Sequence, residues 1–266
     1  MRKINGNTLK IIACIMMLID HIGAAVIVPV YAYGLSIKPF EFEQVKLVYD
    51  IMRHLGRSAF PIFCFLLVEG FVHTSNRLRY SLSLFIFALI SELPYDLAFN
   101  SDEYPFSFDI LEIYTRNQVE WLGSCNVMFT LFIAFVTLWC IDSIKGYLSS
   151  KELPYSNILY LIPGAAVVAL AVLLANRINC DYHGIGILLV VLFYVLRPFE
   201  SFSLFAGYIF LLSLIEVEVY SFPAFILLFL YNKKQGRKLY RLKYLFYAFY
   251  PAHMFILYLL RCVIFG

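Results

Sequence analysis

Near its N-terminus the chain carries the stretch LKIIACIMMLIDHIGAAVIVPV, residues 9–30. Its apolar side chains are interrupted by only three ionisable ones, Lys10, Asp20 and His21. A transmembrane helix needs about 20 mainly apolar residues to cross about 30 Å of hydrocarbon, so this stretch predicts a membrane-spanning helix. At ~1.5 Å per residue, Asp20 and His21 would lie near the middle of the bilayer.

The composition extends this prediction to the whole chain of 266 residues. Apolar residues make up 62% of the chain and charged residues 15%, against about 25% charged in an ordinary soluble domain. A soluble protein has too little polar surface to cover so many apolar side chains. The low charge and the 26 Phe and 20 Tyr exclude a disordered chain. The net charge of +3 is too small to indicate a nucleic-acid partner.

We therefore expect an all-α fold, a polytopic bundle of about nine spans within a single transmembrane domain, residues 1–266. The candidate spans are 9–30, 55–72, 80–99, 127–144, 158–175, 184–196, 202–215, 220–231 and 244–265. Three of them are short, so the expected count is eight to ten. With a cytoplasmic N-terminus, about two thirds of the 21 Lys and Arg fall inside and most acids fall outside, as the positive-inside rule requires.

The polar loops between the expected spans contain few candidate functional residues. The longest, residues 100–126, mixes aromatic and acidic residues and is expected to fold back over the bundle on the outer side. The six cysteines form no CxxC or CxxH spacing, which argues against structural zinc. Cys125 and Cys180 lie in expected outer loops, where an oxidising compartment would allow them to pair.

Ionisable residues inside the spans are costly, at about 2.5–3.5 kcal/mol each on insertion scales, and are candidates for function. Together with the ionisable residues just outside the span ends, they fall into two groups by expected depth. The group from the midplane outward comprises Asp20, His21, His54, Arg57, Glu92, Asp96, Asp181, His183 and His253. The cytoplasmic group comprises Glu69, His73, Arg77 and Arg79. The structural alternatives are that Asp20 only locks helices together by pairing with Arg57, and that Arg77 and Arg79 only set topology.

The sequence contains no Walker loop, no GxSxG elbow and no Rossmann fingerprint, so phosphate hydrolysis and hydride transfer have no support. The histidines show no HxH or HxxxH spacing, and no metal site is expected. Two chemistries remain. One is acid–base catalysis by histidine with carboxylates that orient it, and the other is proton-coupled transport through the same groups. The absence of internal repeats argues against a transporter.

Several motifs together resemble the TraX family of bacterial inner-membrane proteins, named for the pilin N-acetyltransferase of conjugation systems. They are LKIIACIMMLIDHIGA (9–24), RHLGRSAFPIFCFLLVEGFVHTSNRLRY (53–80), LISELPYDLAF (89–99), CNVMFTL (125–131), the Asp-Tyr-x-x-x-Gly motif of 181–186 and the Tyr-Pro-x-His motif of 250–253. The FPIF turn (60–63) is also loosely similar to other multi-pass membrane acyltransferases.

The resemblance implies a multi-pass inner-membrane enzyme that transfers an acetyl group from acetyl-CoA to an amine, such as the N-terminus of a pilin. In this hypothesis His21 is the general base and His253 its rival, and the other catalytic candidates are Asp20 and Glu92 as orienters, Asp96 beside Glu92, and Arg57 as oxyanion donor. The phosphates of acetyl-CoA would meet His73, Asn76, Arg77 and Arg79, and Glu69 would position His73.

Other interpretations of the same residues remain open. A proton-coupled transporter or flippase would use the same intramembrane acids and histidines. A scaffold for pilus or envelope assembly would use them only to hold helices together. Within the enzyme hypothesis, the acceptor is open between a pilin, another secreted or envelope peptide, a lipid amine and a glycan amine.

Overall fold

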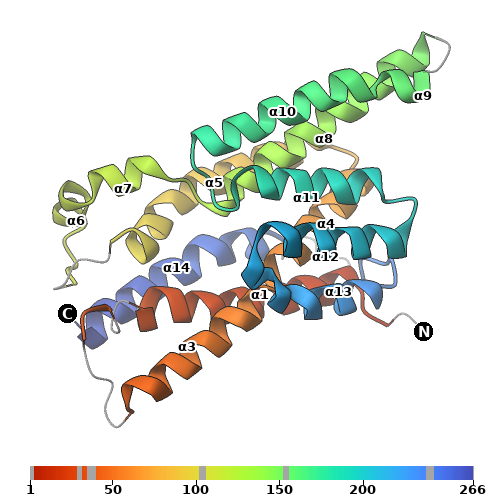
Figure 1. Ribbon diagram of the computed structural model, residues 1–266. Helices are drawn as coiled ribbons and strands as arrows, with labels where there is room; N and C mark the ends of the chain where they lie inside the picture. The colour runs from red at the N-terminus through yellow and green to blue at the C-terminus, as the bar shows by residue number, and fades with distance from the viewer. Residues whose placement is uncertain are drawn as a thin grey trace. The chain divides into compact units, whose positions relative to one another are not determined.

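The computed structural model describes residues 3–28, 32–34, 40–101, 106–151, 156–237 and 243–265. Across these residues the chain forms helices and no strand (Figure 1). It also has two isolated β-bridges. The all-α expectation is therefore confirmed for the described part of the chain. In chain order the helices are α1 (Gly6–Ile22), η1 (Gly23–Ile27), α3 (Phe42–Gly56), α4 (Ala59–His73), α5 (Arg77–Phe99), α6 (Ile110–Arg116), α7 (Gln118–Gly123), α8 (Val127–Ser150), α9 (Ser156–Leu159), α10 (Leu161–Arg177), α11 (His183–Val195), α12 (Glu200–Leu214), η2 (Glu216–Ser221), α13 (Phe222–Phe229) and α14 (Lys243–Phe265).

Five helical stretches of the described residues are long and apolar enough to cross a membrane, as expected of an integral membrane protein. They are Gly6–Ile27, Phe42–His73, Arg77–Phe99, Val127–Ser150 and Tyr244–Phe265. Three further apolar helices, α10, α11 and α12, are shorter. Residues 220–231, expected as the eighth span, contain the end of η2 and the eight-residue α13. The end of the first expected span, at Val30, lies outside the described residues. The nine-span count and the cytoplasmic N-terminus stay predictions.

The second helical stretch begins earlier than residue 55, where the sequence predicts its start. α3 carries a capping box in which the side chains of Glu41 and Gln44 satisfy backbone N–H groups at its beginning. Its charged residues give this segment the composition of a loop, but they alternate with an apolar stripe at helical spacing. The helix therefore forms as an amphipathic one, and it places Arg53 and Arg57 one turn apart.

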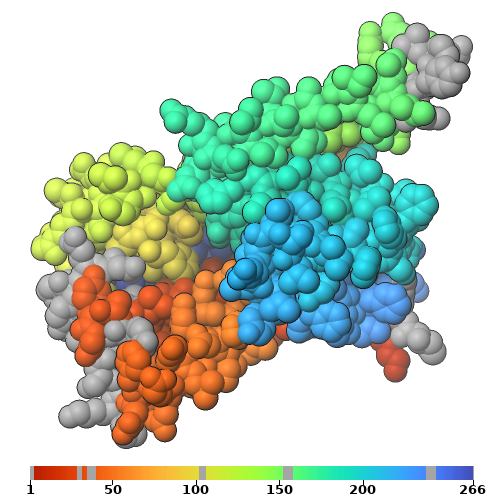
Figure 2. Space-filling model, viewed as in Figure 1, coloured from red at the N-terminus to blue at the C-terminus, as the bar shows by residue number. Residues whose placement is uncertain are grey.

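The chain divides into two compact units. Unit 1 comprises Met1–Phe63, Ile90–Gly123 and Leu212–Gly266, and unit 2 comprises Cys64–Leu89 and Ser124–Leu211. In unit 1, α1 and η1 pack against both α3 and α14, and α3 also contacts η2. Figure 2 shows α3, in orange, at the surface of this unit. In unit 2, the helices α8, α10 and α11 pack against one another. The single transmembrane domain expected from the sequence stays a prediction.

Apolar side chains line one exposed face of α5. Leu78, Leu82, Ile86, Leu89 and Leu93 recur at intervals of three or four residues, and all are exposed in the protein alone. On a soluble protein such a contiguous stripe would be a liability. On a helix that crosses a bilayer it is the surface that contacts the hydrocarbon.

The segment that follows α5 is part of unit 1 and packs against the ends of α5 and α14. Phe106, Ile113 and Trp121 form a buried cluster with Leu97 of α5 and with residues of α14. The indole N–H of Trp121 donates to the carbonyl of Asn100 and to the hydroxyl of Ser101. The described part of residues 100–123 therefore covers the ends of α5 and α14, in agreement with the fold-back expected from its mixed composition.

Candidate functional site

Two histidines that are 232 positions apart in the sequence are hydrogen-bonded in unit 1. His21 Nδ1, on α1, lies 2.7 Å from His253 Nε2, on α14, and the two ring planes are 12° apart. His253 Nδ1 lies 2.6 Å from the backbone carbonyl oxygen of Phe249, one turn earlier on α14. The rings of Phe99 and Tyr250 stand edge-on to His21, so aromatic side chains surround the pair.

The hydrogen bonds determine where the protons of this pair lie when both rings are neutral. A carbonyl oxygen only accepts, so His253 Nδ1 carries a proton and donates it to Phe249. His253 Nε2 is then a lone pair, which accepts from the Nδ1–H of His21. His21 must in turn present an unprotonated Nε2. This tautomer is assigned from the network, and it makes His21 the ring with a nitrogen able to take up a proton.

The backbone around His21 is itself unusual. The α-helical hydrogen bonding of α1 ends at Ile22, and η1 continues the same run as a π-helical segment over Gly23–Ile27. Single π turns inside α-helices occur frequently at functional sites. Here the π segment begins two residues after His21.

Asp20, beside His21, is held by two arginines of α3. Arg53 Nη1 donates to Asp20 Oδ2 at 2.5 Å, and Arg57 Nη2 lies 3.7 Å from Asp20 Oδ1. Both arginines are also electrostatic neighbours of His21. The partner of Asp20 in the structure is therefore an arginine pair, and the hydrogen-bond partner that orients the ring of His21 is His253.

Arg57 also faces a second carboxylate. Its Nη1 lies 3.9 Å from Glu218 Oε1 in η2, and the side chain of Glu218 is fully buried. Burial raises the pKa of Glu218 to about 7, against the opposing effect of Arg57. Next to this ion pair, the ring of His54 stacks on that of Tyr220, with the ring centroids 3.4 Å apart. Asp20, Arg53, Arg57 and Glu218 thus form one charged cluster in unit 1.

The approach of α3 to Asp20 depends on Gly56. A Cβ at this position would lie 2.2 Å from both Cβ and Oδ1 of Asp20, a distance that non-bonded atoms do not adopt. We expect Gly56→Ala to lower the stability by roughly 1–3 kcal/mol, because α3 or Asp20 must move. Thermal unfolding of the purified protein in detergent measures this effect.

Gly146→Ala in α8 is the matched control, because a Cβ there meets nothing within 4 Å. It should leave the stability unchanged or raise it by up to about 1 kcal/mol, since alanine favours a helix over glycine. Equal unfolding temperatures for the two variants would contradict the tight contact between Gly56 and Asp20.

The two acids of α5 that the sequence singles out belong to the same unit. Asp96 is buried and accepts a hydrogen bond at 2.8 Å from the side-chain amide of Asn100. Glu92 lies one turn earlier and is partly buried. As predicted from their spacing, the two lie one helical turn apart on α5. Their proposed roles beside His21 stay predictions.

The candidates for phosphate binding belong to unit 2, where most have structural partners. Glu69 accepts from Arg197 Nε at 3.0 Å, and His73 Nδ1 lies 2.8 Å from the Glu69 carbonyl oxygen. The side chain of Asn76 accepts from the backbone N–H of Arg79 at 2.8 Å, the geometry of a helix N-cap.

Arg77 pairs with Asp142 at 2.8 Å and lies over the ring of Phe71. Asp142 also accepts from the hydroxyl of Tyr194, so several helices of unit 2 meet at this carboxylate. The exposed members of the predicted set are His73, Asn76 and Arg79. Their assignment to acetyl-CoA stays a prediction.

Asp181 and His183, which the sequence groups with His21, belong to unit 2. They follow Cys180, which forms an isolated parallel β-bridge with Cys125. The carbonyl of Asp181 accepts from the hydroxyl of Thr130. Neither cysteine forms a disulfide here, and burial raises the pKa of Cys180. The bridge places next to each other the two cysteines that the sequence identifies as a potential pair.

The sequence does not identify three residues of unit 1 that the structure places in or near the site. Arg53 and Glu218 look like loop charges, and Arg261 looks like an outer topology signal. Arg261 is instead fully buried, with donors directed at backbone carbonyls of α5 and η1. The spacing of Arg53 and Arg57, four residues apart, is a signal that could have paired them on one face of a helix.

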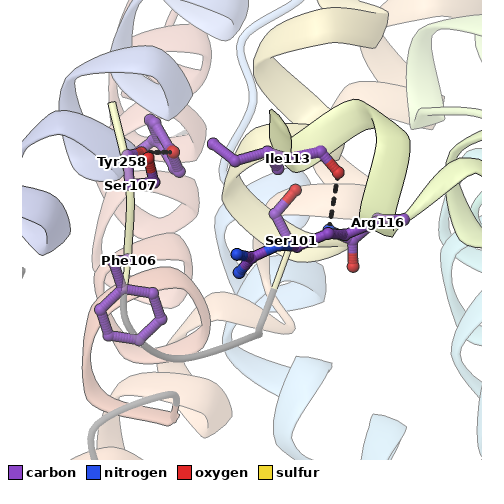
Figure 3. Close-up of a pocket in the computed structure, with 7 residues that line it drawn as sticks. Ser101, Phe106, Ser107, Ile113, Arg116 and Tyr258 are labelled. Atoms are coloured by element: carbon purple, nitrogen blue, oxygen red, sulfur yellow. Dashed lines mark hydrogen bonds between the residues drawn. The ribbon is translucent and has the colours of Figure 1, made fainter. Parts of the chain in front are cut away.

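A small pocket opens beside the buried cluster of unit 1 (Figure 3). Its volume is about 10 Å³, room for about one water molecule, and it lies between Tyr258 of α14 and the α6 residues Ile113 and Arg116. Its lining comprises Ser101, Phe106, Ser107, Ile113, Arg116, Asn117 and Tyr258. It contains neither histidine of the pair. Among the described residues, no group of three or more His, Cys, Asp or Glu is arranged to hold a metal ion.

Comparison with known proteins gives two matches. A family model described as TraX protein matches residues 5–261. A protein of Dichelobacter nodosus, described as "Probable fimbrial assembly protein FimC, serogroup H1", is 27% identical over 226 residues. The alignment covers 79% of this chain and 82% of that protein. No solved structure matches the chain.

Proposed function

The chain belongs to the TraX family, and we propose that it is a membrane-embedded acetyltransferase that moves an acetyl group from acetyl-CoA to an amine. The acceptor we favour is the N-terminus of a pilin or fimbrial subunit at the outer face of the bacterial inner membrane. Two points support this choice: the resemblance to the TraX family implies acetylation of a pilin, and the Dichelobacter relative is described as a "Probable fimbrial assembly protein".

The observation that carries the proposal is the hydrogen-bonded chain from Phe249 through His253 to His21. An amine that attacks a thioester must lose a proton as the new C–N bond forms. A histidine with a free ring nitrogen accepts that proton as a general base. His21 Nε2 is such a nitrogen, and His253 takes the place that a carboxylate holds in a catalytic triad, since it fixes the tautomer of the base.

The charged cluster supplies the second requirement of acyl transfer. As the amine adds, negative charge develops on the thioester oxygen, and a cation beside it lowers the barrier. Arg57 is suited to this role because its guanidinium is partly buried and is an electrostatic neighbour of His21. Asp20, which Arg53 holds at 2.5 Å, keeps the arginines beside α1. Glu92 and Asp96 remain candidate carboxylates of this site, on the neighbouring helix α5.

The reaction itself tests the proposal. Purified protein in lipid nanodiscs, supplied with radiolabelled acetyl-CoA and a peptide with a free N-terminus, should release CoA and acetylate the peptide. In cells, deletion of the gene should remove N-terminal acetylation from one or more envelope proteins, measured by mass spectrometry, and this would also identify the acceptor. Unchanged acetylation in the deletion strain, together with no transfer in vitro, would favour a transporter or scaffold.

A further inference from the structure

A basic surface lies where α1 begins and where the chain approaches α14. Within unit 1, residues 231–237 are held against residues 4–7 by backbone pairing, including the bridge of Ile4 with Tyr231. The backbone N–H of Asn232 donates to the carbonyl of Ile4 at 2.8 Å. The N–H groups of Gly6 and Asn7, which have no partner inside α1, donate to the carbonyls of Lys234 and Gln235.

Specific side chains fix this loop in one conformation. Asn5 caps α1, and its side chain lies where a Cβ on Gly236 would fall, 2.6 Å from the Asn5 oxygen. Gly236 also has a φ of +89°, which favours glycine. The side chain of Asn232 accepts from the N–H of Lys234 at 3.0 Å, and that of Asn7 donates to the Arg237 carbonyl at 2.7 Å. Basic residues that only orient a protein in the membrane need positive charge but no fixed loop conformation. That role therefore does not explain why residues 231–237 are held in one conformation.

The side chains that this loop presents are basic. Lys3, Lys233, Lys234 and Arg237 are exposed, and the sequence from 230 to 243 contains six Lys or Arg and no acid. Among the described residues, no carboxylate lies within ion-pair distance of Lys3, Lys234 or Arg237. Such a surface attracts groups with several negative charges, above all phosphates.

The two helices that follow this surface are the two that carry the histidine pair. α1 begins at Gly6, and His21 lies fifteen residues further, ~22 Å along the helix at 1.5 Å per residue. α14 begins six residues after Arg237, and His253 lies ten residues into it. The ammonium of Lys10 lies 5.8 Å from the ring of Phe246, so the two helices already contact near their first turns.

We propose that this basic surface binds the phosphate groups of the acyl donor, so that an acyl-CoA lies along α1 and α14 with its thioester towards His21. The inference rests on the proposed acetyl transfer, and it assigns the nucleotide end to Lys234, Arg237 and their neighbours in place of the unit 2 residues. In an acyl-CoA about thirteen bonds separate the sulfur from the first phosphorus, ~15 Å when extended at the ~1.2 Å per bond of a peptide chain. The other phosphates of the donor lie further from the sulfur than this. They would therefore come within reach of long basic side chains on a surface that lies ~22 Å from His21.

Phosphate headgroups of anionic lipids share this chemistry, and the experiment separates the two sources. Full-length protein is placed in nanodiscs of zwitterionic phosphatidylcholine, and binding of radiolabelled CoA is measured with adenosine 3′,5′-bisphosphate as competitor. K234S/R237S is compared with K145S/K151S, which removes two exposed lysines from unit 2. We expect the loop variant to weaken CoA binding by about tenfold or more, and the control variant to bind as the wild type does.

Kinetics give a second readout that depends on the phosphates. K234S/R237S should raise the KM for acetyl-CoA but not for an acetyl thioester of N-acetylcysteamine, which lacks the nucleotide. Unchanged CoA binding in the loop variant would overturn the proposal. If H73A/R79A, in unit 2, weakens CoA binding and the loop variant does not, the proposal is also overturned. The same holds if the loop variant retains less phosphatidylglycerol than the wild type but binds CoA equally well.

The outcomes also separate this inference from the proposed function. If the wild type acetylates a peptide and the loop variant binds CoA normally, the phosphate site is wrong and the acetyltransferase stands. If the loop determines CoA binding but no acetyl group is ever transferred, the phosphate site stands and the acetyltransferase is wrong.

Discussion

His21→Ala is expected to lower kcat for acetyl transfer by about 10³-fold while the protein still inserts and folds. The substitution removes the only ring nitrogen of the pair that the tautomer assignment leaves free to accept a proton. General-base catalysis contributes about 10²–10⁴-fold, so a loss in that range is the physical expectation. The KM for the donor should change little, because the role assigned to His21 lies in the chemical step.

The measurement is transfer of radiolabelled acetyl groups by protein that elutes as a single species in detergent. His183→Ala is the control, because it removes an exposed histidine of unit 2 that has no assigned role. Its activity should remain within about twofold of the wild type. A His21→Ala enzyme that retains more than a tenth of the activity would remove His21 as the base.

The same assay shows which of the two histidines is the general base. His253→Gln should cost less than His21→Ala, because a glutamine oxygen can still accept from His21 Nδ1–H. The opposite order, with His253 the more damaging position, would make His253 the base and would require a different tautomer of the pair.

The sequence predicts the parts of this site better than it predicts their partners. The cost of charge in hydrocarbon identifies Asp20, His21 and Arg57 directly, because each interrupts or borders an apolar run. Helical spacing places Glu92 and Asp96 one turn apart. Local sequence patterns do not show which helices contact each other. The hydrogen bond between His21 and His253, at opposite ends of the chain, therefore follows only from the packing of α1 against α14.

The same limit explains the charges that the sequence misassigns. Glu218 lies in a short polar segment between two apolar ones, which is typical of an exposed loop, yet its side chain is fully buried beside Arg57. Residues 42–54 contain as many charged residues as a loop between spans, but their apolar residues recur at helical spacing and they form a helix. In both cases the charged residues face partners from elsewhere in unit 1, and composition alone does not reveal those partners.

Arg261→Leu is expected to have the largest effect on stability. The side chain of Arg261 is 0% exposed and donates four hydrogen bonds to backbone carbonyls. Two of the acceptors, Leu97 and Ala98, lie in the last turn of α5, where helical carbonyls have no partner within the helix. The other two are Ser101, just after α5, and Ala25 in η1. The guanidinium also lies over the rings of Phe106 and Tyr258.

A leucine fills much of the same space but leaves these carbonyls buried without donors, at about 1–3 kcal/mol for each unsatisfied group. A total loss of about 3 kcal/mol or more corresponds to a fall of roughly 6–12 °C in the apparent unfolding temperature. Arg261→Lys should recover only part of it, because an ammonium has three donors on one atom and cannot span acceptors on two helices as a guanidinium fork does.

Fluorescence-detected unfolding in detergent measures these differences, with Arg177→Leu as the control. Arg177 is exposed at the end of α10, so its loss should shift the unfolding temperature by no more than about 2 °C. If Arg261→Leu unfolds at the wild-type temperature, the four carbonyls must have other donors. If it unfolds early, η1 loses the contact that ties it to the end of α5. Acetyl transfer by the residual folded protein should then also fall, because η1 begins two residues after His21.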